Sequence, residues 1–203
     1  MARYALGTFP YAEATLALIK ALDKTSGYVK AGIINTLAQR GAMAQRGAKT
    51  AVPDLISLVT SHDRVVSTAA IRALGRIGGR EALSCLLNLR GKALPRELAL
   101  ERDNALLSCA EKLLRQGKKE QARKIYRIFF EGAKERHIKL AGLRGLITCG
   151  EKEAAGILKE AILKGDGEFR REALRFVTLL GGRRASALSK KLISNYIIIF
   201  MLL

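Results

Sequence analysis

The chain has 203 residues, and 49% of them are hydrophobic, which is enough for a packed core and argues against an intrinsically disordered protein. It has no Trp and only three prolines, which favours helices over a fold of strands and turns. Lys and Arg number 36 against 18 Asp and Glu, so the formal net charge is +18. That charge suits polyanionic partners: nucleic acid, an anionic membrane surface or an acidic protein.

The three cysteines, Cys85, Cys109 and Cys149, are widely spaced, and each lies in an apolar helical run. They indicate small buried side chains rather than a disulfide framework or a zinc site. No long apolar segment follows Met1, so no secretory signal is visible and the cytoplasm is the default expectation.

The segment from Ala51 to Leu83 predicts a pair of helices. Apolar residues recur at helical spacing on both sides of a break at His62 and Asp63. Pro53 suits the first turn of the first helix, where its missing N–H costs nothing. Asp63 can cap the second helix, and Gly78 can end it in a left-handed conformation.

The pattern of this second helix returns four more times, which indicates a repeat protein. The matching sets are Val29, Ile33, Thr36 and Leu37; Val66, Ala70, Ala73 and Leu74; Leu106, Ala110, Leu113 and Leu114; Ile138, Gly142, Gly145 and Leu146; and Phe169, Ala173, Phe176 and Val177. The residues predicted to end these helices are Gly41, Gly78, Gly117, Gly150 and Gly181.

A first helix is predicted before each second helix. The expected ranges are Tyr11–Leu22, Thr50–Val59, Arg80–Leu89, Lys119–Phe130 and Glu151–Leu163. In the third unit, the charged segment from Gly91 to Arg102 contains Pro95 and predicts a longer loop between the two helices.

These elements predict an all-α fold, an α-solenoid in which about five antiparallel helix pairs stack as a right-handed superhelix. One domain is expected over residues 1–192. The pairs are expected at approximately 10–41, 50–78, 80–117, 119–150 and 151–181, followed by a partial helix.

The second helix of the clearest unit ends in the run A-I-R-A-L-G-R-I-G, from Ala70 to Gly78. With Pro53 and the acidic turn at Asp63, this unit resembles a HEAT repeat of the short kind found in phycobilisome-lyase-like proteins. It departs from that pattern where Val65 and Val66 replace the usual arginine. The chain is also similar to HEAT-repeat segments of large bacterial proteins. The resemblance implies that second helices line a concave face and that the role is scaffolding or protein binding.

Both ends of the chain differ from the repeat. Tyr4–Gly7 matches Arg72–Gly75, so the chain is expected to start in the last turn of a second helix and to be a fragment of a longer array. Residues 193–203 form an atypical apolar tail. Its apolar run is shorter than the roughly 20 residues that a membrane-spanning helix needs, so no membrane span is expected.

No catalytic or metal constellation is found, so we expect no enzyme activity and no cofactor. His62 and His137 fall at the turns between paired helices and lack the His-Glu pairs of the iron-dependent deoxyhypusine hydroxylases, a HEAT family. The absence of Trp disfavours a site like those of HEAT-like DNA glycosylases, in which aromatic residues stack on a nucleotide. Nothing marks a bilin pocket.

The remaining candidate is a basic surface between the apolar positions of the second helices. Its residues are Lys30, Arg72, Arg76, Lys112, Arg115, Lys139, Arg144, Arg171 and Arg175. The sequence predicts a non-catalytic scaffold that binds a protein or acidic peptide there. One alternative is electrostatic binding of nucleic acid, and a third is a lyase-like or enzyme-accessory subunit. The same residues also fit ordinary solvated positions.

Overall fold

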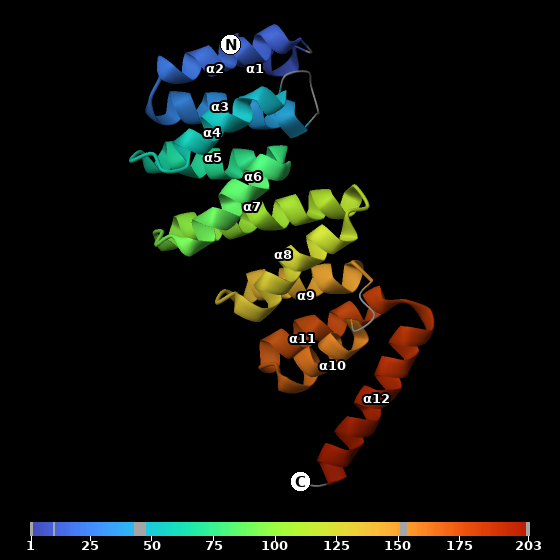
Figure 1. Ribbon diagram of the computed structural model, residues 1–203. Helices are drawn as coiled ribbons and strands as arrows, with labels where there is room; N and C mark the ends of the chain where they lie inside the picture. The colour runs from blue at the N-terminus through green and yellow to red at the C-terminus, as the bar shows by residue number, and fades with distance from the viewer. Residues whose placement is uncertain (1, 10, 43–47, 151–153, 202–203) are drawn as a thin grey trace. The chain divides into compact units, whose positions relative to one another are not determined.

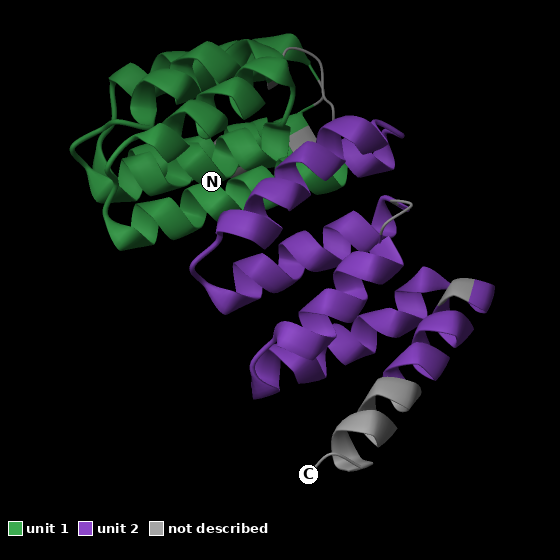
Figure 2. Ribbon diagram, turned by 60° about the horizontal axis from the view of Figure 1, so that its bottom comes forward, with its two compact units in different colours: residues 1–112 green, residues 113–203 purple. Residues whose placement is uncertain are grey.

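A computed structural model describes residues 2–9, 11–42, 48–150 and 154–201. These residues form helices and connecting turns, and no strand occurs among them. The chain divides into two compact units, Met1–Lys112 and Leu113–Leu203 (Figure 2).

Unit 1 is built from helix pairs. Its elements are α1 (Ala2–Thr8), α2 (Ala12–Asp23), α3 (Gly27–Ala42), the 3-10 helix η1 (Ala48–Ala51), α4 (Val52–Leu58), α5 (Arg64–Ile77), α6 (Arg80–Asn88), the 3-10 helix η2 (Leu89–Gly91) and α7 (Arg96–Arg115), whose last residues belong to unit 2. The first helices of the pairs are α2, α4 and α6, and the second helices are α3, α5 and α7. Helices α3 and α5 lie side by side (Figure 1).

Unit 2 continues the same plan. Its elements are α8 (Lys119–Gly132), α9 (Arg136–Thr148), α10 (Ala154–Lys164), α11 (Gly167–Arg175), the 3-10 helix η3 (Phe176–Leu180) and α12 (Gly182–Met201). Helix α8 pairs with α9, and α10 pairs with α11. The core between these pairs includes Leu143, Leu158 and Ile162, which are all fully buried.

The predicted helix pairs are present, and the all-α solenoid is confirmed. The turn chemistry also agrees: Pro53 lies in the first turn of α4, and the Asp63 carboxylate accepts hydrogen bonds from the backbone N–H groups of Val65 and Val66. Gly78 has a φ of 67°, the left-handed conformation expected after a helix. Positive φ is likewise found at Gly117, Gly150 and Gly181.

The prediction for Gly41 is wrong, because Gly41 lies inside α3, which continues to Ala42. Its role is packing. A Cβ atom at this position would lie 2.4 Å from Cγ1 of Ile77 on α5, so the absence of a side chain lets the two second helices approach.

The third unit also differs from expectation. Helix α7 begins at Arg96, so residues 96–102 are helical and the connection after η2 is only Lys92–Pro95. The buried positions of α7 also show that the predicted alignment of this helix with the other second helices is wrong. The buried positions of α7 are Leu98, Arg102, Ala105, Leu106, Cys109 and Ala110, so its buried face begins eight residues before Leu106. Because Gly75 of α5 lies against Ala105, Leu98 rather than Leu106 corresponds to Val66. The extra residues therefore lengthen the second helix instead of the loop.

The repeat pattern matches Val29 to the buried Val66, but Val29 is 63% exposed. The reason is the short helix α1. Its Gly7 lies against Thr36 in the later part of α3, which leaves the first turn of α3 uncovered.

The end of the chain is helical in backbone as far as Met201. The side chains of the predicted apolar tail, residues 193–203, lie outside the described part of the structure. Among the helices that are described, none is long and apolar enough to cross a membrane.

Arg40 is fully buried and joins three elements of unit 1. Its guanidinium donates to the carbonyl oxygens of Leu6 (2.7 Å) and Phe9 at the end of α1, and to that of Tyr11 (2.7 Å) before α2. Its Nε donates to the Thr15 hydroxyl at 2.9 Å. Burial lowers the pKa of Arg40, and these acceptors compensate for the lost hydration of its charge.

The close contacts of glycines give the first prediction. Gly142→Ala is expected to lower the free energy of unfolding of unit 2 by about 1–3 kcal/mol, because the new Cβ would lie 2.6 Å from the backbone nitrogen of Phe130. The matched control is Gly156→Ala in α10, where no atom lies within 4 Å; it should stabilise by about 0.5–1 kcal/mol. Urea unfolding measures both, and equal effects would contradict the packing role.

The second prediction concerns Arg40. Arg40→Gln should lower the free energy of unfolding of unit 1 by about 2–4 kcal/mol, because it leaves buried carbonyl groups without donors. The control is Arg76→Gln, an exposed position where less than about 0.5 kcal/mol is expected. A small loss at Arg40 in urea unfolding would show that these carbonyls find other donors.

Candidate protein-binding face

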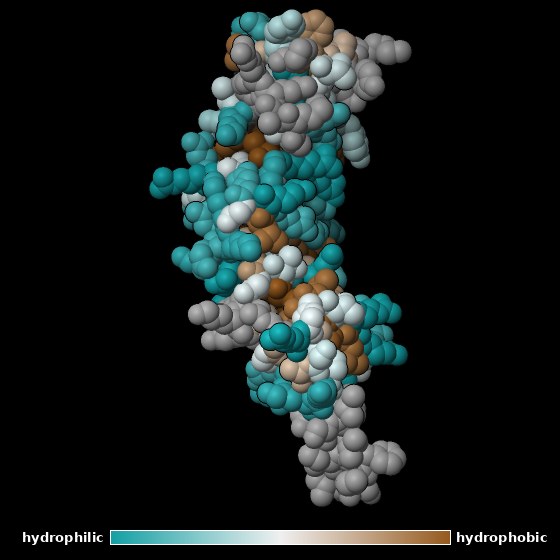
Figure 3. All heavy atoms as spheres, turned by 90° about the vertical axis from the view of Figure 1, so that its right-hand side faces the viewer, coloured by the Kyte–Doolittle hydropathy of each residue, from teal (hydrophilic) through white to brown (hydrophobic). Residues whose placement is uncertain are grey.

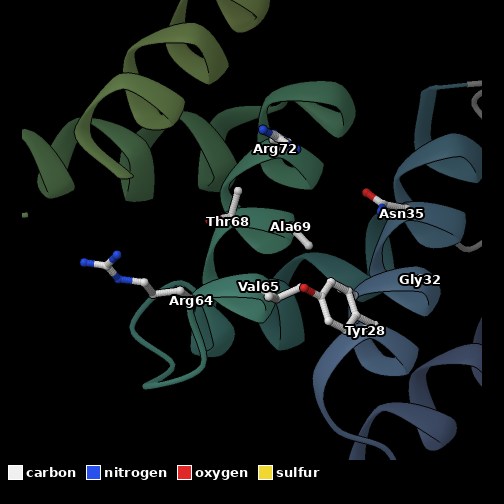
Figure 4. Close-up of a pocket in the computed structure, with 9 residues that line it drawn as sticks. Tyr28, Gly32, Asn35, Arg64, Val65, Thr68, Ala69 and Arg72 are labelled. Carbon is white, nitrogen blue, oxygen red and sulfur yellow. The ribbon is translucent and has the colours of Figure 1, made fainter. Parts of the chain in front are cut away.

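The candidate site is a groove between the second helices α3 and α5 of unit 1, with a volume of about 400 Å³. Residues spaced one helical turn apart on each helix form its walls (Figure 4). The lining residues are Tyr28, Ala31, Gly32 and Asn35 from α3, and Arg64, Val65, Thr68, Ala69 and Arg72 from α5. Small residues at the floor, Gly32 and Ala69, keep the groove open.

Tyr28 is the most exposed large side chain of the site, at 83%. Figure 4 shows its ring reaching from α3 toward Val65 on α5. With the exposed Val29 beside it, Tyr28 provides an aromatic, partly apolar contact at one end of the groove. Exposed aromatic rings of this kind supply much of the binding energy at protein interfaces.

The groove is basic, because Arg64 and Arg72 line it and no acidic residue does. Both arginines are also held from the far side by α7. Arg64 pairs with Glu97 at 3.1 Å, and Arg72 makes a two-pronged pair with Glu101, with Nε at 2.7 Å from Oε2. The hydrogen bond to Glu101 raises the pKa of Arg72. The pair with Glu101 therefore orients the half-exposed Arg72 guanidinium, whereas the pair between Arg64 and Glu97 is largely exposed to solvent.

Two of the predicted basic residues, Lys112 and Lys139, make contacts that stabilise the fold. The Lys112 ammonium donates to the carbonyl oxygens of Arg76 and Ile77 (2.9 Å) at the end of α5. Such carbonyls have no partner within their own helix, so Lys112 acts as a C-terminal cap. The Lys139 ammonium lies over the rings of Phe130 (5.9 Å) and Phe169 (5.7 Å). It thereby links α8, α9 and α11 at a hollow of about 730 Å³.

The nine predicted surface residues therefore do not share one environment. Lys30 is half-buried, whereas Arg76, Arg115, Arg144, Arg171 and Arg175 are exposed. In unit 1, Arg72 and Arg76 share α5. In unit 2, Arg144 lies on α9, and Arg171 and Arg175 lie one turn apart on α11. On the face shown in Figure 3, hydrophilic residues cover most of the surface, and hydrophobic residues show in narrow bands between them.

Sequence reasoning missed the uncharged members of the site, Tyr28 and Asn35. It also missed Asn104, because the register of the third unit was misplaced. With the corrected register, Asn35, Arg72 and Asn104 occupy the same position on α3, α5 and α7, and all three are exposed. The shared position of these three residues could be found from the sequence only by aligning α7 from Leu98.

Outside the groove, the described residues offer few candidate catalytic or metal-binding side chains. His62 and His137 are exposed, and no group of three His, Cys, Asp or Glu side chains there could hold a metal ion. Burial raises the pKa of the Cys109 thiol to about 11 and also raises that of Cys85.

The family model for HEAT repeats matches residues 15–101, which span α2 to the first turns of α7. Residues 15–101 are HEAT repeats. The groove between α3 and α5 thus lies between the second helices of adjacent HEAT repeats. No curated protein matches the chain.

Two crystal structures of engineered proteins are similar to the chain. One is 20% identical, with a TM-score of 0.45, and the match covers 90% of this chain and 54% of the other. The second is 20% identical, with a TM-score of 0.46, and the match covers 92% of this chain and 89% of the other. The chain thus spans about half the length of the first of these two proteins.

The third prediction tests whether α7 fixes the groove. A double-mutant cycle with Arg72→Ala and Glu101→Ala should give a coupling energy of about 0.5–1 kcal/mol, because the pair is two-pronged but half exposed. Thermal or urea unfolding of the four proteins measures it. A coupling energy near zero would mean that Glu101 does not hold Arg72.

Proposed function

We propose that this HEAT-repeat chain is a non-catalytic scaffold whose unit 1 binds an acidic protein segment in the groove between α3 and α5. The observation that supports this most is the composition of the groove: two arginines, an exposed tyrosine and no acid. Peptide carboxylates would accept hydrogen bonds from the guanidinium N–H groups that the pairs with Glu97 and Glu101 leave available.

The amide of Asn35 adds recognition of the peptide backbone. An Asn side chain carries both a donor and an acceptor, so it can bond to the N–H and C=O of an extended segment. Asn104 stands at the same position two second helices away, at about 16–20 Å if adjacent helices are 8–10 Å apart. That distance equals about five or six residues of extended chain.

Tyr28 supplies the apolar part of the interface. Its ring is 83% exposed and has Val29 beside it, so covering it removes apolar surface from water. A suitable ligand therefore combines Asp or Glu side chains with one large apolar residue.

The test uses labelled peptide pools of about nine residues in which every second position is acidic, neutral or basic, with one Leu or Phe in each peptide. We expect the acidic pool to bind most tightly in fluorescence anisotropy. Tyr28→Ala, or Arg64→Gln combined with Arg72→Gln, should weaken binding by about 5- to 30-fold, equivalent to the loss of about 1–2 kcal/mol.

The matched control is Lys20→Gln on α2, an exposed basic residue on a first helix. It changes the net charge without touching the groove, so it should leave affinity within about twofold at moderate salt. Two results would refute the proposal: neutral peptides bound as tightly as acidic ones, or a Lys20→Gln effect as large as that of the groove variants.

A further inference from the structure

The second helices of unit 2 carry a separate cluster of arginines. Arg144 is exposed on α9, and Arg171 and Arg175 are exposed on α11. We propose that this cluster binds the phosphodiester backbone of nucleic acid, which is a different activity from the peptide binding proposed for unit 1.

The geometry places the three guanidinium groups on neighbouring positions. Helices α9 and α11 contact each other, and an ion pair joins Arg136 in the first turn of α9 to Glu168 in the first turn of α11. Lys139, which follows Arg136 on α9, lies over the ring of Phe169, which follows Glu168 on α11. The two helices therefore run in the same direction from the ion pair. Two turns further on, Arg144 and Arg175 therefore stand at the same height.

The spacing suits a phosphate chain. Parallel helices pack with axes about 8–10 Å apart, and the long arginine side chains can close part of that gap. Arg171 extends the cluster by one turn along α11. Three flexible, forked donors over this span can contact successive phosphates, which follow each other at about 3.4 Å of rise along each strand.

The acids near the cluster are already paired. Glu168 binds Arg136, and Glu172 binds Arg175 at 2.9 Å in an exposed pair. Among the residues the structure describes, Arg144 and Arg171 have no acidic partner, in contrast to Arg64 and Arg72 of unit 1. An exposed pair is worth little, so a phosphate can replace Glu172 at Arg175.

The charge of the whole unit favours a long polyanion. Residues 113–203 hold 20 Lys and Arg against 9 Asp and Glu. Three further exposed cations lie where α7 joins α8: Arg115 at the end of α7, Lys118 in the turn, and Lys119 at the start of α8. Repeated cations on repeated helices match a backbone whose charge repeats regardless of sequence.

The experiment measures binding of the full chain to a fluorescein-labelled DNA duplex of about 20 base pairs and to a single strand of the same length, between about 50 and 200 mM salt. Three phosphate contacts from the cluster account for a slope of about −2.7 in log K against log salt for the duplex. They correspond to about a 40-fold loss of affinity over that range.

The test variant replaces Arg144, Arg171 and Arg175 with Gln. Its slope should be smaller in magnitude by about 2.7 on the duplex, or about 2 on the single strand. The matched control replaces Lys124, Lys159 and Lys191 with Gln, which removes the same charge from α8, α10 and α12. Thermal unfolding of both variants confirms that the helices remain folded.

The experiments distinguish failure of the peptide-binding proposal from failure of the nucleic-acid proposal. The variant with Arg64→Gln and Arg72→Gln should bind acidic peptide about 5- to 30-fold more weakly and keep its nucleic-acid slope. The arginine-cluster proposal is refuted if neither nucleic acid binds at 50 mM salt, or if the control variant changes the slope as much as the cluster variant does. It is also refuted if vesicles with about 30% anionic lipid bind while nucleic acid does not.

Discussion

The stacking of second helices depends on their close approach at small residues. In unit 1, Gly41 on α3 faces Ile77 on α5, and Gly75 on α5 faces Ala105 on α7, where a Cβ atom would lie 2.7 Å from the Ala105 Cα. Side chains elsewhere on these helices can therefore form a continuous face instead of separating the helices. The groove with Tyr28, and the contact between Arg72 and Glu101, both follow from this spacing.

The same packing decides how the positive charge is used. Several basic side chains satisfy backbone carbonyls that the ends of neighbouring helices leave without donors: Arg40 at the end of α1, Lys112 at the end of α5, and Arg170, whose Nε lies 2.9 Å from the Ile162 carbonyl oxygen, at the end of α10. These residues are part of the fold. The net charge of the sequence is therefore larger than the positive charge available to a partner. Only the exposed basic side chains that are not engaged in this way can contribute to binding.

Sequence reasoning succeeded where the physics is local. Apolar spacing, Pro53, the Asp63 cap and glycines with positive φ such as Gly78 all act within one or two turns, so they could be predicted from single segments. The register of α7 could not, because the charged residues 96–102 read as a loop until their contacts with α5 and η2 are known. Arg102 shows the reason: it is buried, and its guanidinium donates to the carbonyl oxygen of Leu89 at 3.3 Å, a partner in η2 that the sequence around Arg102 does not reveal. For the site, the arginines were found by charge, whereas Tyr28 and Asn35 depend on which turn of α3 its neighbours leave open.

The two units treat their arginines differently, and this difference is the basis for assigning them different partners. On α5, Arg72 is oriented by its two-pronged pair with Glu101 of α7, and Arg64 has an acidic partner in Glu97, which favours ligands that fit this arrangement beside Tyr28. On α9 and α11, Arg144 and Arg171 are exposed and have no acidic partner among the described residues, so they suit a dense polyanion. An oriented donor favours selectivity because less side-chain entropy is lost on binding, whereas exposed donors without a partner can adapt to any backbone with phosphates. A chain with both kinds could hold a protein segment and a nucleic acid at the same time, each without competing for the other's contacts.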